Sequence, residues 1–272
     1  MLRKLLKHEF KFYIKFVSLS YAILAAALLL ARLCAELLSA VSKHYGENTV
    51  FDLAVFPSAI IFIAAGITVL GVLVLPIVLG AVRFYRNLIK DEGYLSFTLP
   101  VSASSHVFCK VFTPLVFTVL SAIVTALLTG AAIFVFKQSM FANFCEALNE
   151  LTRYGDWKYF VVSTVVTALL SVVSLTTLIA FSFSIGQLFR KQKLLGAIGC
   201  YIGTNMVYNM VSSVVTVAVM VISAEQGAFD ENLSFMNFSL PYFITSAVLS
   251  LAFVVATYLI SCYVLKNKLN LE

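Results

Sequence analysis

The chain has 272 residues, of which 61% are hydrophobic and only 12% are charged, and its mean hydropathy is +0.98. A water-soluble core cannot enclose this much apolar surface, so the composition excludes a soluble globular protein. The net charge of +6 comes from basic residues that cluster at the predicted membrane boundaries, which makes nucleic acid an unexpected partner. The sequence therefore predicts an integral membrane protein whose main surroundings are the lipid bilayer.

The first fifteen residues predict an amphipathic helix on the inner membrane surface. Glu9 falls on the apolar face of this helix, beside Phe10 and Tyr13, where its carboxylate either extends to the interface or meets a basic partner in the folded protein. The opposite face carries a stripe of lysines that is suited to anionic headgroups, namely Lys4, Lys7, Lys11 and Lys15.

Long uncharged stretches follow, and they predict six transmembrane helices, because about 20 apolar residues of helix cross the hydrocarbon layer. No stretch contains the polar break that an additional crossing needs, so tilted helices explain the longer ones. The fold class is therefore all-α, as one transmembrane domain over residues 1–272. The predicted spans are 16–40, 53–82, 109–136, 159–189, 194–224 and 240–265.

The distribution of positive charge sets the orientation. Fourteen of the 19 Lys and Arg residues fall on the side of the N-terminus, so both termini are expected in the cytoplasm of a multi-pass plasma-membrane protein. No cleavage site ends the first apolar run, which is expected to remain as a helix. Arg32 and Glu36 are four residues apart and are expected to pair near the outer interface.

Three predicted spans carry small polar side chains on one face. Such a face predicts either a route through the membrane or a contact between helices, because hydroxyls in lipid also bond to carbonyls of their own helix. An amide that faces lipid is costly, so the two asparagines favour a pathway or a subunit interface. The polar faces are Thr118, Ser121, Thr125 and Thr129 in the third span, Thr164, Thr167, Ser171 and Ser174 in the fourth, and Asn205, Asn209, Ser212 and Thr216 in the fifth.

Glycines and prolines mark positions where helices pack closely or bend. Gly199 and Gly203 form a GxxxG pattern that allows two backbones to approach closely, and dimerisation is one way to supply the second backbone. Pro76 lies deep in the second span and predicts a kink or hinge. Pro57 and Pro114 are expected near helix starts, where proline is better tolerated.

Several kinds of chemistry have no motif in this sequence. The middles of the second to sixth spans contain no charged residue for a proton relay, and there is no HExxH motif or glycine-framed serine nucleophile. The five cysteines show no CxxC spacing, and the three histidines are expected to be solvated or interfacial. We expect no catalytic residue, no metal site and no directly bound cofactor. Since a GxxxxGK[ST] loop is also absent, any ATP must be bound by another chain.

The connector between the second and third spans, residues 86–105, is the most distinctive segment. It contains LIKDEGYLSFTLPVS and is predicted to lie in the cytoplasm, where Gly93 redirects the chain and Pro100 stops a further helix. Tyr94, Leu95 and Phe97 present apolar surface without a partner inside so short a segment. An ordinary interfacial turn, with aromatic rings at headgroup level, is the alternative.

The connector resembles that of the type 2 family of ATP-binding-cassette (ABC) transporter permeases. The family pattern departs at Tyr94, Ser96 and Ala103, where threonine, an acidic residue and a basic residue are common. The predicted topology agrees with the family over the whole chain. The pattern is acidic, x, Gly, x, Leu, then Pro, x, Ser and a later Lys, and it matches Glu92, Gly93, Leu95, Pro100, Ser102 and Lys110.

The resemblance implies a subunit that pairs with a second permease, identical or different, and with separate ABC ATPase subunits. The connector would be a cytoplasmic coupling helix, and the cargo would be an exported antimicrobial peptide, drug or lipid-like compound in a bacterial cell or inner membrane. A self-contained channel or secondary transporter and a non-transporting scaffold are the alternatives. The residues expected to contact the ATPase are Arg86, Asp91, Glu92, Gly93, Tyr94, Leu95, Phe97 and Pro100.

Overall fold

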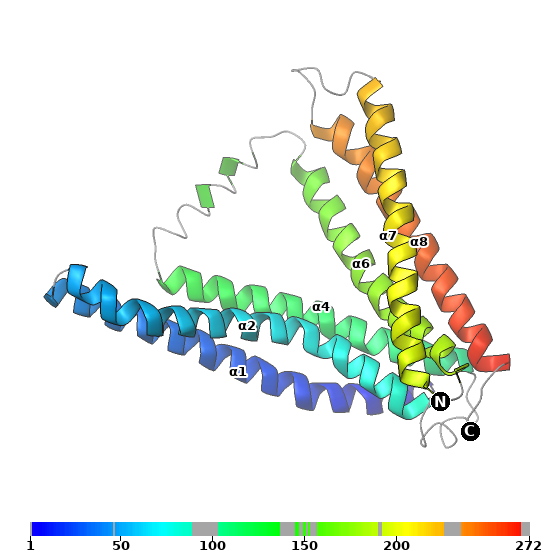
Figure 1. The fold of residues 1–272 in the computed structure, drawn as a ribbon, viewed down its shortest axis with the longest axis horizontal. Coiled ribbons are helices and arrows are strands. Elements are labelled where there is room, and N and C mark those ends of the chain that lie inside the picture. Colours follow the sequence, from blue (N-terminus) through cyan, green and yellow to red (C-terminus); the bar gives the residue numbers. More distant parts are fainter. Residues whose placement is uncertain are drawn as a thin grey trace. The chain divides into compact units, whose positions relative to one another are not determined.

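The computed structural model of the chain describes residues 2–45, 47–88, 103–136, 145–146, 149–150, 152, 157–189, 192–225 and 235–267. Six of its helices are long and apolar enough to cross a membrane, and no strand occurs in the described ranges. The prediction of an all-α membrane protein is thus confirmed. The helices are α1 (Leu2–Tyr45), α2 (Glu47–Leu88), α4 (Ala103–Phe136), α6 (Trp157–Gly186), α7 (Lys193–Glu225) and α8 (Phe235–Asn267) (Figure 1).

Two predicted boundaries near the N-terminus and the connector are corrected. Residues 1–15 and 16–40 were expected as separate helices, but α1 runs without interruption from Leu2 to Tyr45, because this stretch contains no glycine or proline to break it. The third span was expected to begin at 109, whereas α4 begins at Ala103. Residues 89–102 of the connector lie outside the described residues.

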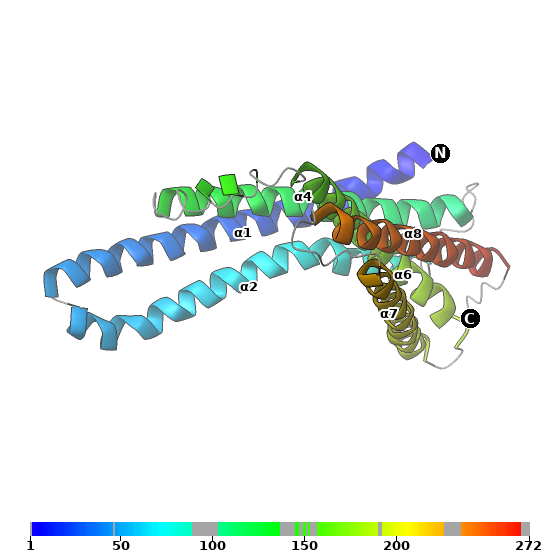
Figure 2. The ribbon, with the colours of Figure 1, turned by 90° about the horizontal axis from the view of Figure 1, so that it is seen from above.

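The chain divides into two compact units. Unit 1 contains Met1–Leu6, Leu79–Leu115 and Asn149–Glu272, and unit 2 contains Lys7–Val78 and Val116–Leu148. Unit 1 therefore holds α6, α7 and α8, which all pack against one another (Figure 1). Unit 2 holds most of α1 and α2, which run antiparallel (Figure 2).

Unit 2 has an aromatic contact between α1 and α4. The ring of Tyr13 stacks on that of Phe117 with 5.1 Å between centroids, and Phe10 lies 5.3 Å from the same ring. Tyr13 and Phe117 are 1% and 4% exposed, so the apolar face of the N-terminal segment packs against protein. The predicted lysine stripe is exposed, as expected.

The two ion-pairing expectations for α1 have different outcomes. Arg32 and Glu36 pair as predicted, with 2.9 Å between Nη2 and Oε1. Glu9 is 4% exposed, which argues against a carboxylate that extends to the interface, and the alternative of a basic partner stays a prediction. Glu9 lies four residues before Tyr13, so both side chains are on the same face of α1, and both are buried.

Candidate functional site

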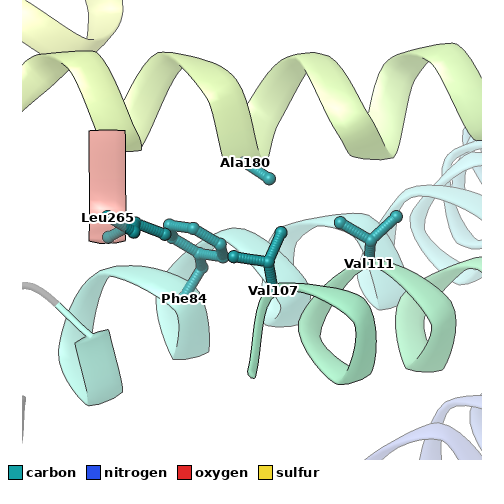
Figure 3. Packing of buried hydrophobic residues seen from close by; sticks show 5 residues of the cluster. All are labelled: Phe84, Val107, Val111, Ala180 and Leu265. Carbon is teal, nitrogen blue, oxygen red and sulfur yellow. The ribbon is translucent and has the colours of Figure 1, made fainter. Parts of the chain in front are cut away.

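The two helices that flank the connector are held together by a buried core in unit 1. Phe84 of α2 is 2% exposed and lies in one buried cluster with Val107 and Val111 of α4, which are 0% and 8% exposed. Ala180 of α6 and Leu265 of α8 complete the cluster, so four helices contribute side chains (Figure 3). We call these five residues the connector clamp.

Aromatic side chains extend the connector clamp toward α6 and α8. Phe84 stacks on Phe183 with 6.0 Å between ring centroids, and Tyr85 lies 5.8 Å from the same ring. The hydroxyl of Tyr258 in α8 donates a long hydrogen bond of 3.5 Å to the carbonyl of Ser104, in the first turn of α4. The last turn of α2 and the first turn of α4 are therefore both attached to the α6 to α8 bundle.

The sequence reasoning missed the connector clamp, although part of the signal is local. Val107 and Val111 are four residues apart and so share one face of α4. Phe84 and Tyr85 form the aromatic pair nearest the C-terminal end of α2. Nothing in the sequence shows that these positions meet Ala180 and Leu265, because that contact depends on how the four helices pack.

Only one of the predicted ATPase-docking residues lies in the described part of the chain. Arg86 lies in the last turn of α2 and is exposed, where a partner could reach it. The helix ends at Leu88, two residues after Arg86. The other predicted docking residues, Asp91, Glu92, Gly93, Tyr94, Leu95, Phe97 and Pro100, lie outside the described residues.

Two polar side chains are buried in the first turns of α4. His106 was expected to be solvated or interfacial, but it is 3% exposed, and Lys110 is 8% exposed. Both belong to the part of α4 that precedes the expected span start at 109 or lies beside it. Burial follows from their spacing, because His106 and Lys110 flank Val107 and Val111 on the face that packs in unit 1.

The polar face of the third predicted span is buried within unit 2. Thr118, Ser121 and Thr125 are 7%, 0% and 5% exposed. The Ser121 hydroxyl lies 3.0 Å from the hydroxyl of Tyr21 in α1, and Thr129 bonds back to the carbonyl of Thr125. This face is a helix contact, which favours the packing interpretation over a route for cargo.

The hydrogen bond between Tyr21 and Ser121 is expected to contribute about 1 kcal/mol to the free energy of unfolding. Tyr21→Phe and Ser121→Ala should each lower that free energy, and the double variant should lose less than the sum of the two. A double-mutant cycle, measured by unfolding in mixed detergent micelles, gives the coupling. Ser171→Ala is the control, because the hydroxyl of the exposed Ser171 donates to the carbonyl of Ala168 in its own helix. Full additivity of the Tyr21→Phe and Ser121→Ala losses would contradict the contact.

The polar side chains of α6 and α7 form hydrogen bonds within their own helices, unlike Ser121 of α4. The α6 hydroxyls bond to carbonyls of their own helix, as Thr164 does to Phe160 at 2.8 Å. On α7 the amide of Asn209 donates to the carbonyl of Asn205 at 2.9 Å and to its side-chain oxygen. Asn209 is exposed, whereas Asn205, Ser212 and Thr216 are half-buried. The prediction of a pathway or interface role for this face stays a prediction.

Close backbone packing in unit 1 occurs at a different glycine from the predicted ones. A Cβ placed on Gly199 or Gly203 would meet no heavy atom within 4 Å, so neither packs tightly inside this chain. A Cβ on Gly186 would lie 2.6 Å from the Cβ of Ala197 and 2.7 Å from its Cα. The end of α6 and the start of α7 therefore approach backbone to backbone.

No family model, no curated protein and no solved structure matches the chain. Within the described residues, no group of three or more His, Cys, Asp or Glu side chains could hold a metal ion. The candidate site is therefore defined by the connector clamp and by the exposed end of α2 at Arg86.

Proposed function

We propose that this chain is the membrane-spanning permease subunit of an ABC exporter. In this proposal the connector, residues 86–105, binds a separate ATPase subunit on the cytoplasmic side, where both termini also lie. The sequence pattern from Glu92 to Lys110 supports the assignment, and the lack of a GxxxxGK[ST] loop requires ATP to be bound elsewhere.

The observation that carries the proposal is the connector clamp. A docking segment can move membrane helices only if its two ends are fixed to them. Phe84 at one end and Val107 at the other are both buried against α6 and α8. Closely packed side chains transmit displacement because they resist compression. A force on the connector would therefore act on four helices together.

The polar groups in the membrane spans indicate the class of cargo. The middles of α4, α6, α7 and α8 contain hydroxyl and amide groups but no charged residue, which suits an amphipathic compound better than an ion. An antimicrobial peptide, a drug or a lipid-like molecule has this character. We infer a pair of permease subunits in a bacterial cell membrane, with the polar face at Asn205 and Asn209 near the route or the subunit contact.

Replacing Tyr94 and Phe97 with alanine is expected to reduce recovery of the ATPase with the tagged chain at least about tenfold, because two buried aromatic anchors dominate such contacts. The variant should still insert into the membrane. Co-purification from native membranes, followed by identification of a protein with a GxxxxGK[ST] loop, measures the effect.

The matched control replaces Phe108 and Tyr263 with alanine. These are also one phenylalanine and one tyrosine, and they are 41% and 60% exposed on helices of unit 1. Recovery of the ATPase should be unchanged in this control. If the chain from native membranes carries no such ATPase, or if both double variants lose it equally, the assignment of the connector fails.

A further inference from the structure

The two helices that flank the connector contain three interior prolines, Pro57 and Pro76 in α2 and Pro114 in α4. Pro76 lies in α2 and Pro114 lies in α4, and both side chains are buried. Proline has no N–H group, so Val72 and Lys110 receive no helical hydrogen bond from these positions. Pro57 and Pro114 were expected near helix starts, but α2 begins at Glu47 and α4 begins at Ala103, which places both prolines well inside their helices. Both helices are therefore weakened at a defined point.

The packing of the chain changes at the same two points. Along α2, unit 2 ends at Val78 and unit 1 begins at Leu79, directly after Pro76. Along α4, unit 1 ends at Leu115 and unit 2 resumes at Val116, directly after Pro114.

The two prolines also lie at matching distances from the connector. Pro76 is followed by about 18 Å of helix to the end of α2 at Leu88, and Pro114 is preceded by about 17 Å of helix from Ala103. Phe84 and Val107 hold these two inner segments together. The two helices are thus weakened by these prolines at about the same distance from the connector.

Thr113, the residue before Pro114, carries a buried hydroxyl. Buried hydroxyls in the spans commonly bond to a carbonyl of their own helix, as Ser182 and Ser184 do. Thr113 is 1% exposed, yet its hydroxyl has no hydrogen-bond partner among the described residues. The helix therefore lacks a side-chain bond at the point where it also lacks a backbone bond.

We propose that Pro76 and Pro114 form one paired hinge, about which the outer parts of α2 and α4 bend together relative to their inner parts. The sequence predicted a hinge at Pro76 alone. Of α1, only the start of the helix up to Leu6 belongs to unit 1. The hinge is a property of this chain and needs no ATPase, so it stands or falls separately from the proposed function.

The test measures distances between spin labels in the purified, cysteine-free full chain in lipid nanodiscs. One label replaces the exposed Leu33 in unit 2, and the other replaces the exposed Leu259 in unit 1. The chain with both prolines should give a broad distance distribution. Replacing both prolines with alanine, which restores the backbone donors, should narrow it about twofold, and each single replacement should narrow it less.

Two controls keep the result interpretable. A label pair at Leu37 and Leu127, both exposed in unit 2, should give a narrow distribution in every variant, which also shows that each variant is folded. Replacing Pro57 and Pro241 with alanine changes two prolines away from the unit boundary and should leave the Leu33 to Leu259 distribution unchanged. A narrow distribution in the parent chain, an unnarrowed Pro76→Ala, Pro114→Ala variant, or equal narrowing by the control prolines would overturn the hinge.

Discussion

Replacing Phe84 with alanine is expected to lower the free energy of unfolding by about 2–3 kcal/mol. The value is at the low end for a buried phenylalanine, because a side chain released into lipid loses packing contacts but is not exposed to water. Phe84 is 2% exposed and touches both Val107 and Phe183, so its removal leaves a cavity among four helices. Unfolding in mixed detergent micelles measures the loss.

Phe62 provides the matched control in the same helix. It is 48% exposed, so Phe62→Ala should change the free energy of unfolding by no more than about 0.5 kcal/mol. Similar losses for the two variants would show that the connector clamp is not a close-packed core. The proposed route from the connector to α6 and α8 would then lose its physical basis.

Replacing Gly186 with alanine should lower the free energy of unfolding by about 1–3 kcal/mol, the usual cost of overpacking. The added methyl group would lie 2.7 Å from both the backbone N and the Cα of Ala197. A backbone cannot rotate aside as a flexible side chain can, so α6 and α7 must separate. The same unfolding measurement applies.

The controls for this variant are Gly199→Ala and Gly203→Ala. Neither methyl group would meet another atom of the chain within 4 Å, and alanine favours a helix over glycine. Both variants should be at least as stable as the parent chain. If Gly199→Ala is as damaging as Gly186→Ala, the loss in Gly186→Ala cannot be assigned to the close approach of α6 and α7.

Helix existence was predictable because it depends on local hydropathy, whereas some boundaries were not. The predicted spans all correspond to helices, since long apolar stretches leave no other structure for the backbone in lipid. The start of α4 was placed too late because His106, expected to be solvated or interfacial, precedes the predicted span. Its burial depends on neighbouring helices, which one sequence does not specify. The continuity of α1 was readable from its lack of helix breakers.

The candidate site was less predictable than the fold, because its parts come from distant segments. Arg86 and the apolar residues of the connector were recognised from a local pattern, but the connector clamp joins Phe84 to Leu265 across most of the chain. Small residues showed a related ambiguity. Within this chain the tight approach is at Gly186 and not at Gly199, and the GxxxG pattern stays a prediction for a contact with a second chain.

The central claim is that the connector contacts an ATPase, and cross-linking in native membranes tests it most directly. A photoreactive amino acid replaces Tyr94, and the cross-linked products are identified by mass spectrometry. The control position is the exposed Tyr159, near the start of α6, which is predicted to lie at the outer face. We expect position 94, and not position 159, to cross-link to a protein with a GxxxxGK[ST] loop. Products from position 94 that contain only lipid or this chain itself would contradict it.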